Sequence, residues 1–208
     1  MLWANELLSD IKYGENIMKK LITALGALLP IAFAGQLLGQ DMEDTITVTS
    51  TIFEHHGMVP EENSAYGANT SIDLSWSNLP SGTQSLALIC DDPKVVEIGM
   101  MESPFVHWVV YNIPSSASGL PGGLSSDAEP NVNGLAGMIN GNNGLGRPGY
   151  FGPRPPANGQ LHQYDFRIYA LDADLNLEAG LDKAQLLEAM DGHILGTGLL
   201  MGHYERKE

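Results

Sequence analysis

The sequence predicts a mainly β domain, built from antiparallel strands with a helix at its periphery. Runs of β-favouring residues with period-two alternation recur from residue 45 onward, and a helical pattern appears only afterwards, near the C-terminus. Strands that follow one another without intervening helices favour antiparallel pairing over the parallel sheets of α/β proteins. The chain shows no internal repeat and no second composition regime, so we expect a single domain over residues 45–208.

Four strand patterns occupy the first half of this domain. Thr45–Phe53 and Ser71–Trp76 alternate between apolar and polar side chains, as half-buried strands do. Ser85–Asp92 is almost continuously apolar, which indicates a central strand covered on both faces. Phe105–Ile113 is another long β run, and we expect Pro114 to end it because proline has no N–H to donate.

The second half begins with a long segment that has no periodicity, Ser115–Leu161, which is rich in Gly, Pro, Asn and Ser. A loop of this length inside a compact domain usually serves a function. The β pattern returns in Gln163–Leu171. Asp182 is placed to cap a helix over Lys183–Leu195, and Leu199–Tyr204 reads as a last short strand.

The first 34 residues predict an upstream extension followed by a signal peptide. From Met18 the chain has two lysines, then the apolar run Leu21–Ile31, then the small-residue cleavage pattern Ala32–Ala34. We therefore expect translation to start at Met18, cleavage near Ala34 and a short tether over residues 35–44. The apolar run is too short for a membrane span, so the sequence predicts a protein exported to the periplasm or the medium, without a membrane-spanning segment.

Charge and cysteine content exclude several classes of function. The formal net charge is −15, with 10 Lys and Arg against 25 Asp and Glu. Nucleic-acid binding needs a basic surface, so no nucleic-acid partner is expected, and flat docking on anionic lipid is disfavoured. The single cysteine, Cys90, excludes an intrachain disulfide and a cysteine metal cage. It lies in an apolar run, which favours a buried, inert thiol.

Three polar side chains, Asp92, His107 and His162, fall at strand positions whose parity is otherwise apolar. His107, for example, shares parity with Val109 and Tyr111. A buried carboxylate needs hydrogen-bond donors, and a nearby carboxylate favours the charged form of an imidazole. Two such histidines backed by Asp92 would grip a phosphate-like anion. The plainer alternative is that each histidine is a hydrogen-bonded core residue and that Asp92, which precedes a proline, forms a turn.

A Gly- and Pro-dense segment, Gly149–Tyr164, leads directly into this constellation. It reads GYFGPRPPANGQLHQY and ends on His162 and Tyr164, whose side chains share one parity. Prolines restrict the backbone and glycines allow close approach, so the segment is typical of a stiff, open wall of a small-molecule pocket.

These residues resemble the phosphatidylethanolamine-binding protein family, especially its bacterial and archaeal Raf-kinase-inhibitor-like branch. The resemblance is carried by Asp91-Asp92-Pro93, Pro104–Pro114, Gly149–Asp172 and Leu186–Arg206, and extends from about Thr45 to Arg206. It implies an antiparallel β-sandwich with Greek-key connections and peripheral helices. It also implies a pocket for phosphate, phosphorylethanolamine or acetate-like groups, formed by Asp92, His107, Gly152, Pro155, Pro156, His162 and Tyr164.

The chain departs from the family pattern at two places. The family commonly has Asp-Pro-Asp-Ala-Pro where this chain has Asp92-Pro93-Lys94-Val95-Val96, so a lysine replaces the second carboxylate. That change would either make the entrance more cationic or loosen the loop, and the sequence leaves both open. The helix that covers part of the pocket in eukaryotic members has no visible counterpart beyond Tyr204.

The sequence thus favours a non-enzymatic binder of a small anion or phospholipid headgroup, acting as an inhibitor or scaffold for a protein target, with no cofactor and no metal. One alternative is a hydrolase that uses the same Asp-His-His trio with a metal, or a histidine as general base. Against it, the chain has no G-x-S-x-G and no H-E-x-x-H motif. Another is an interaction module that recognises a phosphoresidue or a terminus of a partner. The sequence also leaves a homodimer open.

Overall fold

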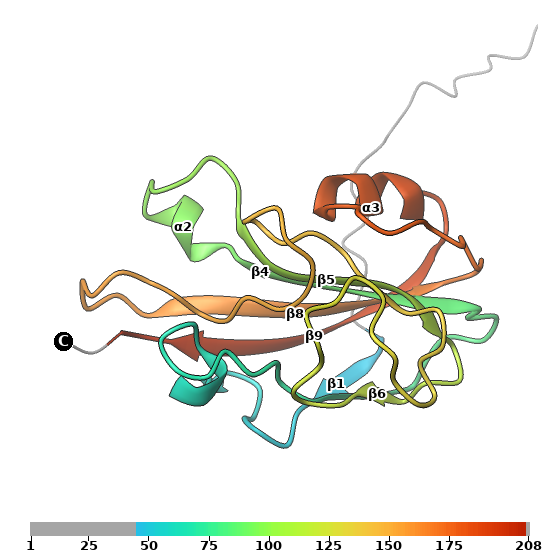
Figure 1. The fold of residues 1–208 in the computed structure, drawn as a ribbon, viewed down its shortest axis with the longest axis horizontal. Coiled ribbons are helices and arrows are strands. Elements are labelled where there is room, and N and C mark those ends of the chain that lie inside the picture. Colours follow the sequence, from blue (N-terminus) through green and yellow to red (C-terminus); the bar gives the residue numbers. More distant parts are fainter. Residues whose placement is uncertain (1–44, 207–208) are drawn as a thin grey trace, which may run out of the picture. The chain divides into compact units, whose positions relative to one another are not determined.

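The computed structural model describes residues 45–206, which lie in the compact unit Asp41–Glu208. This part of the chain is mainly β, as predicted (Figure 1). One sheet has three strands in the order β1 (Thr47–Thr49), β3 (Leu74–Ser77) and β6 (Gly119–Leu120). The other has six, in the order β2 (Gly57–Met58), β9 (Ile194–Tyr204), β8 (His162–Leu171), β4 (Ser85–Asp92), β5 (Phe105–Pro114) and β7 (Ile139–Asn140).

The six-stranded sheet has Greek-key connectivity. Its strands β8, β4, β5 and β7 lie side by side in that order and pair antiparallel, so the last strand along the chain returns beside the first. The apolar strand β4 lies between β5 and β8, which confirms that it is central. The pairing of β2 with β9 is parallel and is two residues long.

The main hydrophobic core fills the space between the two sheets. Trp76 from the small sheet faces side chains of the large one, among them Trp108 and Phe166, both fully buried. Cys90 also lies in this core, and burial raises the pKa of its thiol, which keeps it protonated and inert as expected.

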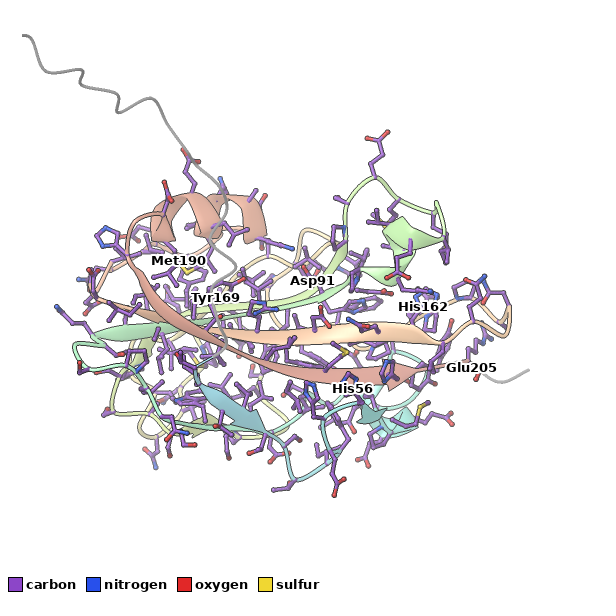
Figure 2. All side chains as sticks on the ribbon, turned by 180° about the vertical axis from the view of Figure 1, so that it is seen from behind. His56, Asp91, His162, Tyr169, Met190 and Glu205 are labelled. Atoms are coloured by element: carbon purple, nitrogen blue, oxygen red, sulfur yellow. The ribbon has the colours of Figure 1, made fainter. Side chains whose placement is uncertain are left out.

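A second, smaller core lies on the other face of the large sheet, under the helix α3 (Lys183–Met190). Figure 1 shows α3 and the small sheet on opposite sides of the large sheet. Leu186 and Met190 are its buried helical contacts, and Figure 2 shows Met190 and Tyr169 between the helix and the sheet. Because both faces of β4 are covered, this strand has no polar side, as its composition predicted.

The first strand is shorter than expected. The alternation over Thr45–Phe53 predicted a strand of nine residues, but β1 ends at Thr49. The side chain of Asp73 accepts hydrogen bonds from the Ser50 hydroxyl at 3.0 Å and from the Thr51 amide at 3.1 Å. A side chain that binds the backbone in this way replaces the ladder hydrogen bonds and turns the chain out of the sheet.

The C-terminal helix is also shorter than predicted, and the strand after it is longer. Asp182 caps α3 as expected, in a capping box with Gln185, but the helix ends at Met190 instead of Leu195. Gly192 has a φ of 79°, a left-handed conformation that stops the helix. Ile194 then pairs with Leu171 of β8, so its apolar side chain belongs to a strand.

Five short elements were not predicted: the strands β2, β6 and β7, the 3-10 turn η1 (Glu61–Asn63) and the single helical turn α2 (Lys94–Glu97). Within residues 45–206, no helix combines the length and the apolar character needed to cross a membrane. The predicted signal peptide, its start at Met18 and the tether over residues 35–44 lie outside the described residues.

Candidate functional site

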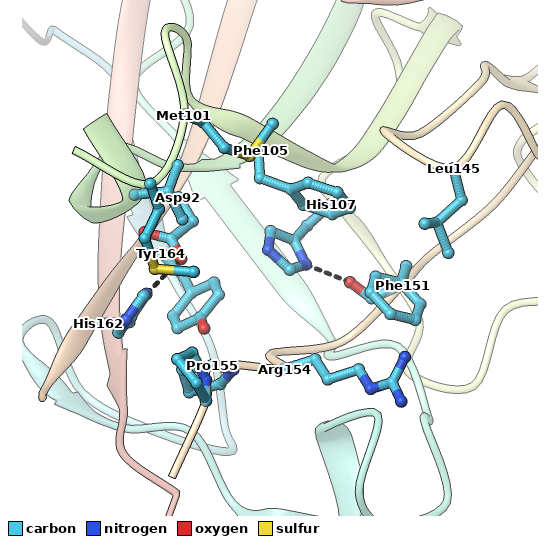
Figure 3. A pocket seen from close by; sticks show the side chains of 13 residues that line it. Asp92, Met101, Phe105, His107, Leu145, Phe151, Arg154, Pro155, His162 and Tyr164 are labelled. Atoms are coloured by element: carbon cyan, nitrogen blue, oxygen red, sulfur yellow. Dashed lines mark hydrogen bonds and ion pairs between the residues drawn. The ribbon is translucent and has the colours of Figure 1, made fainter. Parts of the chain in front are cut away.

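A cavity of about 230 Å³ opens where β4 ends and where β5 and β8 begin (Figure 3). These three strands are neighbours in the large sheet, so residues far apart in sequence meet at one edge. The segment after α2 and the proline-rich segment before β8 form its sides. The lining residues are Asp92, Val95, Met100, Met101, Phe105, His107, Leu145, Phe151, Arg154, Pro155, Pro156, His162 and Tyr164.

A buried acid–imidazole pair lies in this cavity. His162 Nδ1 is 2.7 Å from Asp92 Oδ2, and both residues are at most 3% exposed. The other carboxylate oxygen of Asp92 accepts a hydrogen bond from the Lys94 amide at 2.8 Å, at the start of α2. Burial raises the pKa of the Asp92 carboxyl, and its hydrogen bond with His162 acts in the opposite direction. Asp92 therefore orients His162, as the family resemblance implied, and also begins a turn.

His107 also lines the cavity, but its place there was not predicted by strand parity. In the β4–β5 register Cys90 lies opposite Trp108 while Asp91 lies opposite Val106, so His107 is the extra residue of a β-bulge. Val106 and Val109 pack in the second core, under α3, whereas Trp108 packs in the main core. The shared parity of His107 with Val109 and Tyr111 was therefore a wrong guide, because the bulge reverses the alternation of faces.

The hydrogen bond of His107 gives it a different character from His162. Its Nδ1 is 2.6 Å from the carbonyl oxygen of Phe151, which can only accept, so Nδ1 carries a proton. The ring stacks on Phe151 at 5.9 Å and meets the edge of Phe105 at 4.8 Å. Burial lowers the pKa of His107 to about 4, so the ring is neutral near pH 7. The expectation of two cationic histidines is thus wrong for His107.

Two buried polar atoms in the cavity lack a hydrogen-bond partner among the described residues: His162 Nε2 and the Tyr164 hydroxyl. The Tyr164 ring meets His107 edge to face at 5.0 Å. Burial, followed by the nearby Asp92 carboxylate, raises the pKa of the Tyr164 hydroxyl, which therefore keeps its proton. Buried polar groups nearly always have partners, so two such atoms in one cavity indicate a place for a guest.

The proline-rich segment contributes a wall, although not with every predicted residue. Pro155 and Pro156 line the cavity, and the Tyr66 hydroxyl holds the Pro155 carbonyl at 2.7 Å. Gly152 does not line it. Its amide donates to the Asn69 side chain at 2.7 Å, and a Cβ added there would overlap the Asn63 carbonyl oxygen. Gly152 thus lets the loop pass close to η1, and its role is structural.

Other lining residues were missed by sequence reasoning. Arg154 places an exposed guanidinium at the cavity edge, inside the very segment that was singled out. Met100, Met101 and Leu145 form an apolar rim, each more than 40% exposed. Segments that are far apart in the sequence bring these three side chains together around one opening. No local sequence pattern could therefore have predicted the rim.

The lysine that departs from the family pattern does not reach the cavity. Lys94 Nζ pairs with Glu97 Oε2 at 2.7 Å on the outside of α2, and Lys94 is not among the lining residues. The first alternative, a more cationic entrance, is therefore not realised by this side chain. Among the described residues, no three His, Cys, Asp or Glu side chains are arranged to hold a metal ion.

Fold and site together define a Greek-key β-sandwich with a buried acid–imidazole pair in a small cavity at the sheet edge. Comparison with known proteins identifies the family to which a protein of this class belongs. A family model described as phosphatidylethanolamine-binding protein matches residues 49–205. A UPF0098 protein of Methanothermobacter thermautotrophicus is 41% identical over 155 residues, which cover 74% of this chain and 95% of that protein. The chain belongs to the phosphatidylethanolamine-binding protein family.

Solved structures agree with this assignment. A putative phosphatidylethanolamine-binding protein homologue from Chlamydia trachomatis, CT736, is 37% identical, with a TM-score of 0.68, and is matched over 79% of this chain and 99% of its own. Escherichia coli YbcL, described as a member of the mammalian family, is 26% identical with a TM-score of 0.70, over 78% and 99%. The resemblance to the bacterial and archaeal branch is confirmed.

The buried, neutral state of His107 predicts a loss of stability in acid. Its pKa of about 4 in the folded protein lies below the ordinary value of 6.5, so between these values the unfolded chain binds a proton that the folded chain does not. Acidification from pH 6.5 to 4 should lower the free energy of unfolding by up to about 3 kcal/mol through this residue. Denaturant unfolding of wild type and His107→Phe across this range measures it.

The comparison with the variant is needed because Asp92 and Asp165 titrate in the opposite sense. Burial raises the pKa of both carboxyls, so protonation of each favours the folded state in acid. Their contribution is common to both proteins, and the difference between the two curves isolates His107. Parallel curves would show that the pKa of His107 is the same in the folded and unfolded states, which contradicts the prediction.

Proposed function

We propose that this protein binds a small anionic group, of the phosphate or phosphorylethanolamine kind, in the cavity of Asp92, His107 and His162, without chemical turnover. The observation that carries the proposal is the pair of unpartnered polar atoms, His162 Nε2 and the Tyr164 hydroxyl. An oxyanion placed between them would accept a hydrogen bond from each. Leaving a buried polar group unpaired costs about 1–3 kcal/mol, so a guest that pairs both is stabilised strongly.

The hydrogen bond between Asp92 and His162 favours an anion over a neutral guest. His162 donates through Nδ1 to Asp92, so it donates through Nε2 as well only when the ring is an imidazolium. A bound anion would compensate the positive charge of that form. Arg154 adds a cation at the cavity edge. A local site of this kind operates in spite of the net charge of −15, because short hydrogen bonds outweigh a screened distant field.

The rim favours a protein as the carrier of the anionic group. Met100, Met101 and Leu145 are 53%, 42% and 43% exposed around the opening, and methionine adapts to varied partners. A phosphorylated side chain or a chain terminus that enters the cavity would bring apolar neighbours onto this rim. In this proposal the protein inhibits or scaffolds a protein target, with this rim as the contact surface.

Turnover is not part of the proposal. No serine, threonine or cysteine lines the cavity, so the cavity wall offers none of these side chains as a nucleophile beside His107 or His162. Incubation of the protein with phosphorylethanolamine and ³¹P NMR of the mixture tests this directly. Release of inorganic phosphate that His162→Gln abolishes would establish the hydrolase alternative instead.

Anion binding should raise the melting temperature of the wild-type protein and should fail in His162→Gln. A ligand at about 100 times its dissociation constant stabilises a protein by about 2.7 kcal/mol. The matched control is His193→Gln, which removes a histidine that also pairs with a carboxylate, Asp172, at 2.8 Å, but on the surface and outside the cavity. Thermal unfolding with and without phosphorylethanolamine provides the measurement. Equal stabilisation of all three proteins would disprove the site.

We also propose that the protein is exported, on the basis of the lysines, apolar run and cleavage pattern between Met18 and Ala34. Expression in a bacterial host should yield mature protein outside the cytoplasm that begins near Gly35. N-terminal sequencing of this protein identifies its first residue. Retention in the cytoplasm with residues 18–34 still attached would contradict export.

A further inference from the structure

The second ring nitrogen of His107 gives the cavity a hydrogen-bond acceptor. Nδ1 is committed to the Phe151 carbonyl at 2.6 Å. The two nitrogens of an imidazole point in nearly opposite directions, so Nε2 faces away from Phe151, and Figure 3 shows the ring in the cavity wall beside Tyr164. A neutral ring with its proton on Nδ1 has a lone pair on Nε2. Within the described chain, the Tyr164 hydroxyl makes no hydrogen bond to it.

The cavity therefore presents groups of two kinds to one guest. His162 Nε2 and the Tyr164 hydroxyl offer protons, whereas His107 Nε2 requires one. We propose that His107 makes this site selective for phosphomonoesters in their singly protonated form, and against phosphodiesters and sulfate. This inference rests on the proposed anion binding and adds a ligand class to it.

The reason is the number of protons that each guest carries. A phosphomonoester loses its second proton with a pKa of about 6, so a P–O–H donor is available near neutral pH. A phosphodiester monoanion and sulfate have no such proton, and their oxygen lone pairs would face the lone pair of Nε2. These guests could bind only if His107 took a proton from solvent, and its pKa of about 4 opposes that near pH 7.

The other charged and titratable groups in the cavity do not remove this requirement. Asp92 is occupied by His162 and by the Lys94 amide, at 2.7 and 2.8 Å. Arg154 at the edge attracts every anion, whatever its protonation. The hydrogen bond between the ligand oxygen and His107 Nε2 requires one proton between the two atoms. That proton can be bound to either atom, but without it the hydrogen bond does not form. An intact phospholipid is a phosphodiester. The proposed site therefore prefers phosphomonoesters, whether free or attached to a protein, over the headgroups of intact lipids.

The sharpest test compares monomethyl phosphate with dimethyl phosphate at pH 6 by calorimetric titration of the full-length protein. At pH 6 about half of the monomethyl phosphate is singly charged. In that form it has the same charge as dimethyl phosphate and carries an O–H group where the diester carries O–CH3. In the complex with dimethyl phosphate, the buried acceptor His107 Nε2 would have no donor. This ligand should therefore bind at least about tenfold more weakly than monomethyl phosphate. Sulfate should be equally weak. Equal affinities for the two methyl phosphates, with both lost in His162→Gln, would overturn the selectivity and leave the proposed anion site intact. No binding of any of these anions would overturn both.

A second arm uses the wild-type protein alone, so it does not depend on the folding of a variant. From pH 6 to pH 8 the singly protonated fraction of a phosphomonoester falls roughly fiftyfold, while sulfate does not change. The ratio of monomethyl phosphate to sulfate affinity should therefore fall with pH, and changes at His162 cancel in that ratio. A constant ratio contradicts the proposal.

His107→Phe completes the design because phenylalanine keeps a ring in the aromatic stack and removes the acceptor. This variant should bind the two methyl phosphates with similar affinity, and retained selectivity would overturn the role of His107. Phosphorylethanolamine and a phosphoserine peptide then distinguish the source of the monoester, and binding of either supports the inference. Binding of phosphatidylethanolamine vesicles as tightly as these monoesters would overturn it.

Discussion

The hydrogen bond between Asp92 and His162 is the constraint on which the site depends. Both groups are buried, and a buried carboxylate or imidazolium is tolerated only when it is paired. The antiparallel pairing of β4 with β8 runs to Asp91 opposite Asp165, so Asp92 follows directly on the last pair, at the end of β4 that lies beside the start of β8 at His162. Cross-strand diagonal neighbours on one face are within reach of long side chains. The sheet arrangement therefore brings the pair together and places His162 in the cavity wall, with its Nε2 unpartnered among the described residues.

The two histidines in this cavity differ because their partners differ. His162 pairs with a carboxylate, whereas His107 pairs with a carbonyl and is surrounded by Phe105, Phe151 and Tyr164. A carbonyl oxygen fixes the proton on Nδ1 but does not offset the desolvation of a charge, so His107 stays neutral. One sheet edge thus supplies a donor and an acceptor from the same residue type.

Much of this arrangement was accessible from sequence, because the relevant signals are local. A continuous apolar run located β4, a long run of β-favouring residues located β5, and the returning β pattern located β8. The parity of His162 with Tyr164 put both in the cavity. The β-bulge at His107 was not accessible, since it depends on how β4 pairs with β5. The role of Gly152 could not be predicted either. It depends on the close approach of η1, a segment about 90 residues earlier in the chain. Parity arguments hold only while the ladder is regular.

The net charge of −15 and the proposed proton selection act in the same direction. A strongly acidic protein repels a dianion more than a monoanion as the ligand approaches, and this field extends about a Debye length from the surface. Inside the cavity, an imidazolium at His162 would be balanced by Asp92, so a second negative charge on the guest would have only Arg154, at the exposed edge, to neutralise it. A guest that arrives with one proton meets less repulsion outside and supplies the hydrogen that His107 requires inside. Discrimination by proton count is therefore consistent with an anion site in so acidic a chain.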